Sequence, residues 1–89
     1  MYLAKVRGTV VSTQKDARLV GFKLLITQRI DTQGEYVGKP DVSVDTVGAG
    51  VGETVIIAGG SSARYAADRP NSPIDSTIIG IVDTTEVED

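Results

Sequence analysis

Apolar and polar residues alternate along three short segments of the chain, residues 2–13, 22–30 and 41–47. A period of two residues is typical of β-strands, because successive side chains of a strand point to opposite faces of its sheet. Glycine, proline and polar residues dominate the interval between the second and third segments, residues 31–40, which predicts a turn followed by a loop. The pattern therefore predicts three strands in the first half of the chain.

Two further segments, residues 54–58 and 77–82, are apolar at successive positions and do not alternate. In an antiparallel sheet, one face of a strand usually meets water. A chain of 89 residues has no second layer large enough to cover the outer face of two such strands, so the pattern predicts that another copy of the chain covers them. The alternative is that a short helix and the C-terminal tail cover these strands within one subunit.

One short helix is predicted over residues 63–67, where alanine recurs and the side chain of Ser61 or Ser62 can cap the first turn. Pro70 and Pro73 follow the helix and exclude the connecting segment from any central strand. The second half of the chain therefore contributes two strands and this helix.

Five strands and one helix in 89 residues predict an all-β fold, a single small β-barrel domain. We place the domain at residues 1–83. Residues 84–89 form an acidic tail, which we expect to fray unless a partner holds it. No internal repeat and no second domain boundary are visible in the sequence.

Two glycine-rich loops, residues 48–53 and 59–64, flank the fourth predicted strand and contain five of the ten glycines. Glycine at this density indicates tight turns, positive φ angles or close approach by another backbone. The first loop differs from a dinucleotide-binding loop in its glycine spacing, and it leads into a strand, whereas a phosphate-binding loop opens a helix. We therefore expect these loops to fit against other proteins and not to bind a nucleotide.

Four aspartates are candidates for acid–base chemistry, since Asp41 and Asp45 share one face of the third strand and Asp75 and Asp83 flank the fifth. Aspartates at strand ends more often accept hydrogen bonds from turn N–H groups. We favour this structural role, with Asp45, next to the first glycine loop, as its best candidate. A small carboxylate-dependent enzyme stays open as an alternative.

The chain contains no cysteine and no histidine. Disulfides, thiolate metal sites, the commonest general base and the commonest metal ligand are therefore all missing. We predict a protein that is not an enzyme and has no cofactor and no metal. The sequence also lacks an apolar run of about 18 residues and a signal-peptide pattern, so we expect a cytoplasmic protein without membrane contact.

Charge is distributed unevenly, with +5 over residues 1–29 and −8 over residues 30–89. Opposite charges could meet across the barrel within one subunit, which we favour slightly, or between the basic part of one subunit and the acidic part of the next. The basic first third also leaves an OB-type nucleic-acid-binding module as an alternative function. A net charge of −3 and only four aromatic residues argue against it, because such modules need a cationic groove and stacking platforms.

The chain resembles the EutN/CcmL family, the pentameric vertex proteins of bacterial microcompartment shells. The resemblance covers almost the whole length and is carried by five segments in the same order and spacing: VRGTVVSTQK (6–15), GFKLL (21–25), DTVGAGVGE (45–53), GSSAR (60–64) and DSTIIGIVD (75–83). It implies a five-stranded OB-like β-barrel that assembles as a homopentamer. It also implies a structural role, in which the pentamer caps the vertices of a polyhedral shell in the cytoplasm that is otherwise built from hexameric and trimeric proteins.

The resemblance further implies which residues contact the neighbouring shell proteins. The expected shell-tile interface consists of Thr13, Lys15, Gly48, Ala49, Gly50, Val51, Gly52 and Glu53. Subunit or tile contacts are also expected at Ser61, Ser62, Ala63 and Arg64. Glycine suits such an interface, because it permits backbones to approach where a Cβ would clash.

Overall fold

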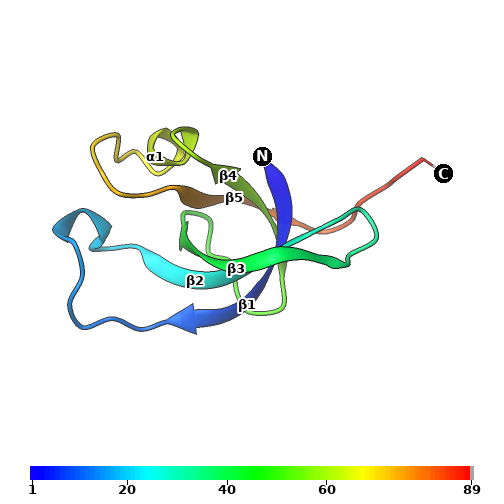
Figure 1. Cartoon of the computed structure of the whole chain (residues 1–89), viewed down its shortest axis with the longest axis horizontal. Coiled ribbons are helices and arrows are strands. Elements are labelled where there is room, and N and C mark those ends of the chain that lie inside the picture. Colours follow the sequence, from blue (N-terminus) through cyan, green and yellow to red (C-terminus); the bar gives the residue numbers. More distant parts are fainter. Residues whose placement is uncertain (89) are drawn as a thin grey trace.

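The computed structural model describes residues 1–88 and consists mainly of β-strands (Figure 1). The strands are β1 (Tyr2–Val10), β2 (Lys23–Ile30), β3 (Tyr36–Asp45), β4 (Thr54–Gly59) and β5 (Ser76–Val82). A short 3-10 helix, η1 (Ala17–Leu19), precedes β2, and the α-helix α1 (Ser62–Ala66) lies between β4 and β5.

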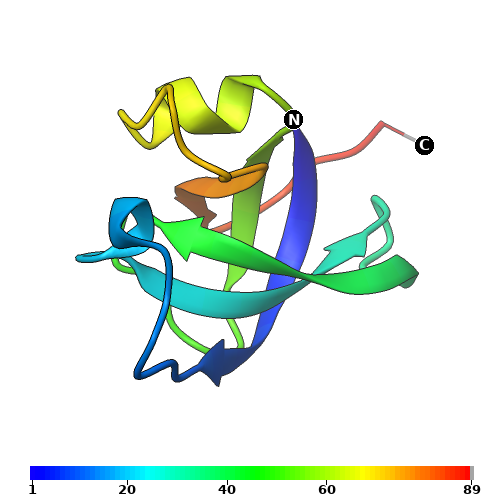
Figure 2. The ribbon, with the colours of Figure 1, turned by 60° about the vertical axis from the view of Figure 1, so that its left-hand side comes forward.

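The strands close into a barrel in the order β1-β2-β3-β5-β4, with β4 pairing back to β1. All neighbours are antiparallel except β3 and β5, which pair in parallel through Val44 with Thr77 and Asp45 with Ile78. Figure 2 shows β1, β2 and β3 curving around β4 and β5. The predicted all-β, five-stranded, OB-like barrel with one short helix is confirmed.

The barrel interior is small and filled mainly by aliphatic side chains that alternate inward along the strands. Its buried residues are Ala4, Val6, Leu25, Ala49, Val55, Ile57 and Ile78. A chain of buried hydroxyls continues the interior, since the Oγ atom of Ser43 lies 2.7 Å from Thr27 Oγ1 and 2.6 Å from Ser76 Oγ. These polar groups satisfy one another, which makes their burial tolerable.

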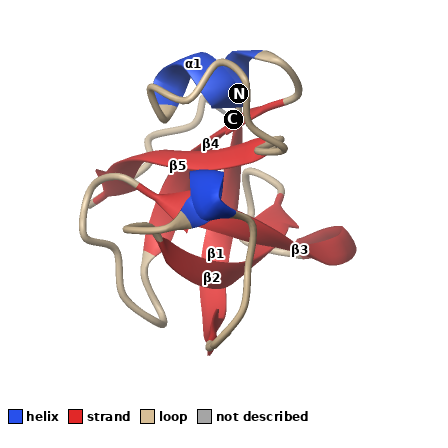
Figure 3. Ribbon diagram, turned by 90° about the vertical axis from the view of Figure 1, so that its left-hand side faces the viewer, coloured by secondary structure: helices blue, strands red, loops and turns tan. Residues whose placement is uncertain are grey.

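A second, smaller core lies under α1, which rests on β4 and β5 (Figure 3). Its buried members are Val44, Ala63, Ala67 and Ile74, with Leu19, Phe22 and Leu24 packed against them. The Oγ1 atom of Thr77 donates to the carbonyl of Ala63 at 2.7 Å and fixes the helix to β5. Several apolar side chains of β4 and β5 stay outside both cores, of which Ile81 is 38% exposed.

Strand β3 begins five residues before the predicted segment, because residues 36–40 extend it where a loop was expected. Pro40 is compatible with this strand, since β3 pairs there with β2 alone and has an unpaired second edge. Strand β1 ends at Val10, three residues earlier than predicted. The unpredicted helix η1 follows it and is capped by Asp16, whose side chain accepts from Arg18 N–H at 2.9 Å. The expected N-cap is also wrong in detail, because Ser61 forms no side-chain capping bond and Ser62 Oγ donates to the carbonyl of Gly59 at 2.8 Å.

The expected meeting of opposite charges across the barrel is not observed. Within residues 1–88 the ion pair is Arg18 with Asp16, at 2.6 Å between Nη2 and Oδ2, and it joins neighbours in the same loop. The remaining charged groups form no ion pair within this part of the chain, and those without hydrogen bonds of their own stay available for contacts outside the subunit.

Helix α1 ends in a left-handed turn at Asp68, whose φ is 56°. The N–H of Arg69 donates to the carbonyl of Arg64 at 2.8 Å, which completes a helix-terminating motif that usually places glycine at this position. We expect Asp68→Gly to raise the free energy of unfolding by roughly 1 kcal/mol, because it relieves the steric cost of a side chain at positive φ. Urea denaturation followed by circular dichroism measures the change.

Asp83→Gly is the matched control for that measurement, because it removes the same charge from an exposed residue that is not at positive φ. It should give no gain. A midpoint for Asp68→Gly at or below that of the unmodified chain would contradict the expectation.

Candidate functional site

The loop of residues 48–53, called the glycine loop below, connects β3 to β4 and lies along β1. The N–H of Gly52 donates to the carbonyl of Val6 at 2.8 Å, and the N–H of Val6 donates to the carbonyl of Glu53 at 2.9 Å. These two bonds continue the pairing of β1 with β4 into the loop. The loop backbone is therefore held by the barrel wall.

Asp45 organises the entrance to the glycine loop from the last position of β3. One carboxylate oxygen accepts from Val47 N–H at 3.1 Å, and the other accepts from Gly48 N–H at 3.0 Å and Ala49 N–H at 2.9 Å. The predicted structural role of Asp45 is confirmed. Its partners are backbone amides, which favours a loop-building role over acid–base chemistry.

The end of the glycine loop is fixed by Glu53, whose Oε1 atom accepts from Gly50 N–H at 2.6 Å. Ala49 is fully buried in the barrel core, and its carbonyl accepts from Lys23 Nζ at 2.9 Å. The Ala49 side chain therefore packs within its own subunit and presents nothing to a neighbour. Val51 stands at the opposite extreme, with 63% of its surface exposed.

Gly48 and Gly52 both have positive φ angles, 83° and 92°. A Cβ at either position would meet no atom of the chain within 4 Å, so the backbone conformation, and not a lack of space, favours glycine there. Between them, the loop exposes main chain and the side chain of Val51. This is the surface expected of a loop that another backbone approaches closely.

Thr13 and Lys15 lie in the exposed connection between β1 and η1. Lys15 Nζ donates to the carbonyl of Ser12 at 3.3 Å, and no hydrogen bond within residues 1–88 joins this connection to the glycine loop. The two predicted parts of the interface are thus separate features of one subunit.

Residues 61–64 begin helix α1 and mainly support their own subunit. Ala63 is fully buried in the second core, and Arg64 Nη1 donates to the carbonyl of Ile74 at 3.2 Å. Ser61 and Ser62 are exposed. Of the four residues predicted to contact subunits or tiles, these two serines present the most accessible surface.

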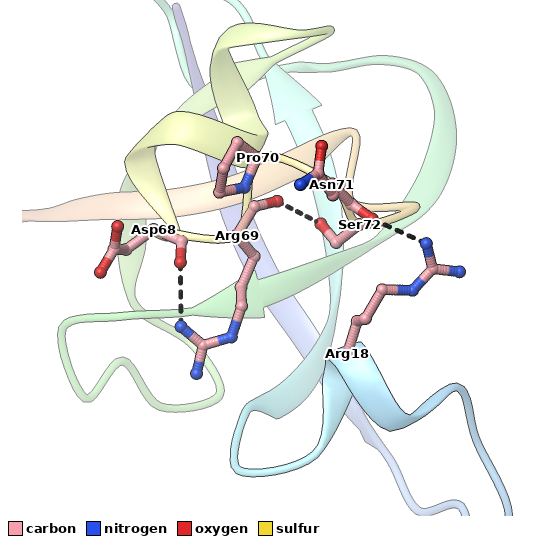
Figure 4. A pocket seen from close by; sticks show the side chains of 6 residues that line it. All are labelled: Arg18, Asp68, Arg69, Pro70, Asn71 and Ser72. Atoms are coloured by element: carbon pink, nitrogen blue, oxygen red, sulfur yellow. Dashed lines mark hydrogen bonds between the residues drawn. The ribbon is translucent and has the colours of Figure 1, made fainter.

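A hollow of about 210 Å³ lies between η1 and the connection that follows α1, lined by Arg18, Asp68, Arg69, Pro70, Asn71 and Ser72 (Figure 4). Arg18 is fully engaged there, since Nε and Nη2 bind Asp16 at 2.8 and 2.6 Å and Nη1 donates to the carbonyl of Asn71 at 2.7 Å. The guanidinium lowers the pKa of the Asp16 carboxyl through these bonds. The hollow is a joint between two loops, of which the Asp16-x-Arg18 spacing could have indicated only the local ion pair.

Residues 1–88 contain no cluster of three or more histidine, cysteine, aspartate or glutamate side chains that could hold a metal ion. No helix in this part of the chain is long and apolar enough to cross a membrane.

The family described as "Ethanolamine utilisation protein EutN/carboxysome" matches residues 1–83. The bacterial microcompartment shell vertex protein PduN of Salmonella typhimurium is 52% identical over 88 residues, which cover 94% of this chain and 97% of PduN. The carboxysome shell vertex protein CcmL of Nostoc sp. PCC 7120 is 49% identical over 90 residues, which cover 100% of this chain and 89% of CcmL.

Solved structures agree with these sequence relatives. The GrpN pentameric microcompartment shell protein from Rhodospirillum rubrum has a TM-score of 0.87 and 50% identity, with 100% of both chains covered. An ethanolamine utilization protein, EutN, has a TM-score of 0.93 and 44% identity, with 98% of this chain and 91% of EutN covered. The predicted family and vertex function are confirmed, and nothing in these comparisons supports the nucleic-acid-binding alternative. The chain belongs to the EutN/CcmL family of microcompartment shell vertex proteins.

Proposed function

We propose that five copies of this chain close into a ring that caps the vertices of a bacterial microcompartment shell and contacts hexameric and trimeric shell proteins through its glycine loop. The observation that carries the ring is the match over 100% of both chains to the pentameric shell protein GrpN, at 50% identity. The role is structural and non-enzymatic. The relatives that support it are named as shell vertex proteins of microcompartments and carboxysomes.

The glycine loop suits the contact surface between neighbouring shell proteins, called the seam below, because its backbone is rigid and most of its side chains are small. The carboxylates of Asp45 and Glu53 hold the loop backbone in place, so little conformational entropy is lost when a neighbour binds. Gly48, Gly52 and the exposed Val51 form its outer surface. A neighbouring backbone can approach the glycines without meeting a Cβ.

Charged and polar groups around the glycine loop fix the register of the seam. Lys15 extends from an exposed connection and can reach an acidic group or a carbonyl on the neighbouring protein. Such rim contacts set orientation more than affinity. Thr13 supplies a hydroxyl to the same contact, whereas Ala49 is left out of it because its side chain is buried.

The ring itself requires the same heterologous contact to repeat around a fivefold axis. The unpaired basic residues of the first third and the acidic residues of the remainder suit a head-to-tail contact between subunits, because residues 1–88 hold only the local Arg18–Asp16 pair. The exposed Ser61 and Ser62 can add hydrogen bonds at either a subunit or a tile contact.

Native mass spectrometry of the purified chain tests the ring directly. We expect a particle of five chains, about five times the subunit mass of 9.4 kDa. Sedimentation over a range of protein concentrations checks that the pentamer also forms in solution. A chain that remains monomeric at every concentration would overturn the proposed vertex assembly.

A further inference from the structure

The C-terminal segment called the tail below, residues 83–88, joins Asp83 to the described part of the predicted acidic tail and is exposed along its whole length. Figures 1 and 2 show it running away from the barrel, toward the same end of the molecule as the turn between β2 and β3. It carries the carboxylates of Asp83, Glu86 and Glu88, and none of its side chains forms a hydrogen bond or ion pair with residues 1–82. The tail is thus an acidic segment without a partner in its own subunit.

The first half of β3, residues 36–42, is also without a partner on one edge. It pairs with β2 only, because β5 joins β3 only at Val44 and Asp45. All seven residues are exposed, and they include the large apolar side chains of Tyr36, Val37 and Val42. Unpaired strand edges are usually covered or blocked in stable proteins, and Lys39 and Pro40 block part of this one. The exposed apolar side chains of Tyr36, Val37 and Val42 are what indicates a contact with another chain.

Two adjoining hollows lie beside this strand edge and share Tyr2, Arg29 and Val37. The first, about 280 Å³, is also lined by Thr27, Gly38, Lys39 and Asp41, and the second, about 420 Å³, by Met1, Leu3, Ile30, Asp31 and Thr32. Together they form a depression of mixed polar and apolar lining, built by the first half of β3 and by the neighbouring ends of β1 and β2.

The basic groups of this depression have unused hydrogen-bonding capacity. Arg29 stacks on Tyr2, with its guanidinium carbon 4.7 Å from the ring centre, and neither Arg29 nor Lys39 donates a side-chain hydrogen bond to any of residues 1–88. Two carboxylates share the depression: Asp31 Oδ1 accepts from the N–H groups of Gln33 and Glu35, and Asp41 Oδ1 accepts from Val42 N–H. The donors of Arg29 and Lys39 are therefore free for an acidic ligand, whereas Asp31 and Asp41 each accept backbone hydrogen bonds through one oxygen.

We propose that the acidic tail of one subunit binds the depression lined by Arg29 and Lys39 on the next subunit, along the free edge of β3. The inference rests on the proposed pentamer, in which each subunit has such a neighbour. Free hydrogen-bonding groups select the occupant: the tail places three carboxylates without a donor within six residues, and the depression holds two cations without an acceptor beside the carboxylates of Asp31 and Asp41. Val87 lies among these carboxylates and can contact the exposed Val37.

Engineered cysteines test this contact without background, because the chain has no cysteine of its own. In the double variant Lys39→Cys with Glu86→Cys, mild oxidation should link most chains into a ladder of two to five subunits on a non-reducing gel. The control pairs Glu86→Cys with Val11→Cys, at another exposed residue, in the connection after β1, and should stay largely unlinked.

The same sample distinguishes failure of the tail contact from failure of the ring. If native mass gives five chains while the Lys39→Cys and Glu86→Cys pair yields only monomers, linked internally or not at all, the tail contact is wrong and the vertex assembly stands. If no pentamer forms, the tail contact and the vertex assembly are both wrong. A ladder as strong in the Val11→Cys control would show random collision and would also overturn the contact.

Charge reversal gives a second, independent measurement. Lys39→Glu or Glu86→Lys alone should raise the protein concentration at which the ring half-dissociates by roughly fivefold, the effect of one exposed ion pair. Combining the two changes should restore the original value, because the reversed charges pair again. Additive weakening in the double variant would contradict the contact.

Discussion

Val51→Asp is expected to abolish the closure of microcompartment shells while leaving the pentamer intact. Val51 is 63% exposed on the glycine loop, and the proposed seam places a neighbouring shell protein against it. A carboxylate buried there without a partner costs several kcal/mol, and the ring repeats this cost at every subunit. Negative-stain electron microscopy of shells assembled with hexameric partners measures closure, and native mass measures the pentamer.

Lys15→Glu should give a milder defect, because it reverses one charge at the rim of the same seam. Val20→Asp is the control, since Val20 is as exposed as Val51 and lies outside the proposed seam. It should assemble like the unmodified chain. Closed shells at normal yield with Val51→Asp would remove the glycine loop from the seam.

Gly50 is a less informative position for the same experiment. Its N–H donates to Glu53 Oε1 at 2.6 Å, and a Cβ on it would lie 3.4 Å from that oxygen. An aspartate there would repel Glu53 and rearrange the loop. A failure to close shells could then come either from a rearranged loop or from a disrupted contact with the neighbouring shell protein, and the experiment would not separate the two causes.

The barrel could be predicted from the sequence because its strands are short and either alternate or are continuously apolar. The pattern failed at the start of β3, where Gly38 and Pro40 usually indicate a loop. A proline is excluded only where both edges of a strand are paired, and β3 has one unpaired edge at Pro40. One-dimensional patterns do not contain that information, since it depends on which strand becomes the neighbour.

The candidate site was predictable in outline, and less so in the role of individual side chains. Asp45 could be identified because an aspartate that precedes a glycine turn commonly accepts its N–H groups. Ala49 and Ala63 could not be told apart from surface residues, because small side chains occur both in loops and in tight cores. The Arg18 joint depends on a carbonyl 53 residues away, at Asn71, so no local pattern reveals that contact.

Asp45→Ala should destabilise the subunit and loosen the glycine loop. The substitution removes the acceptor of three N–H groups, of which those of Val47 and Gly48 are exposed and can turn to water, whereas that of Ala49 is partly buried. We therefore expect a loss of roughly 2 kcal/mol, with most of it from the partly buried amide. For a domain of this size, that loss lowers the thermal midpoint by about 10 °C, measured by circular dichroism.

Asp41→Ala is the matched control, because Asp41 lies on the same face of β3 and its carboxylate accepts only from its neighbour Val42 at 3.1 Å. It should lower the midpoint much less. Asp45→Asn should fall between the two, since an amide oxygen replaces only part of the carboxylate's accepting capacity. Equal thermal midpoints for Asp45→Ala and Asp41→Ala would show that the carboxylate of Asp45 does not hold the glycine loop. The rigidity that suits this loop to a shell seam would then have to come from its pairing with β1.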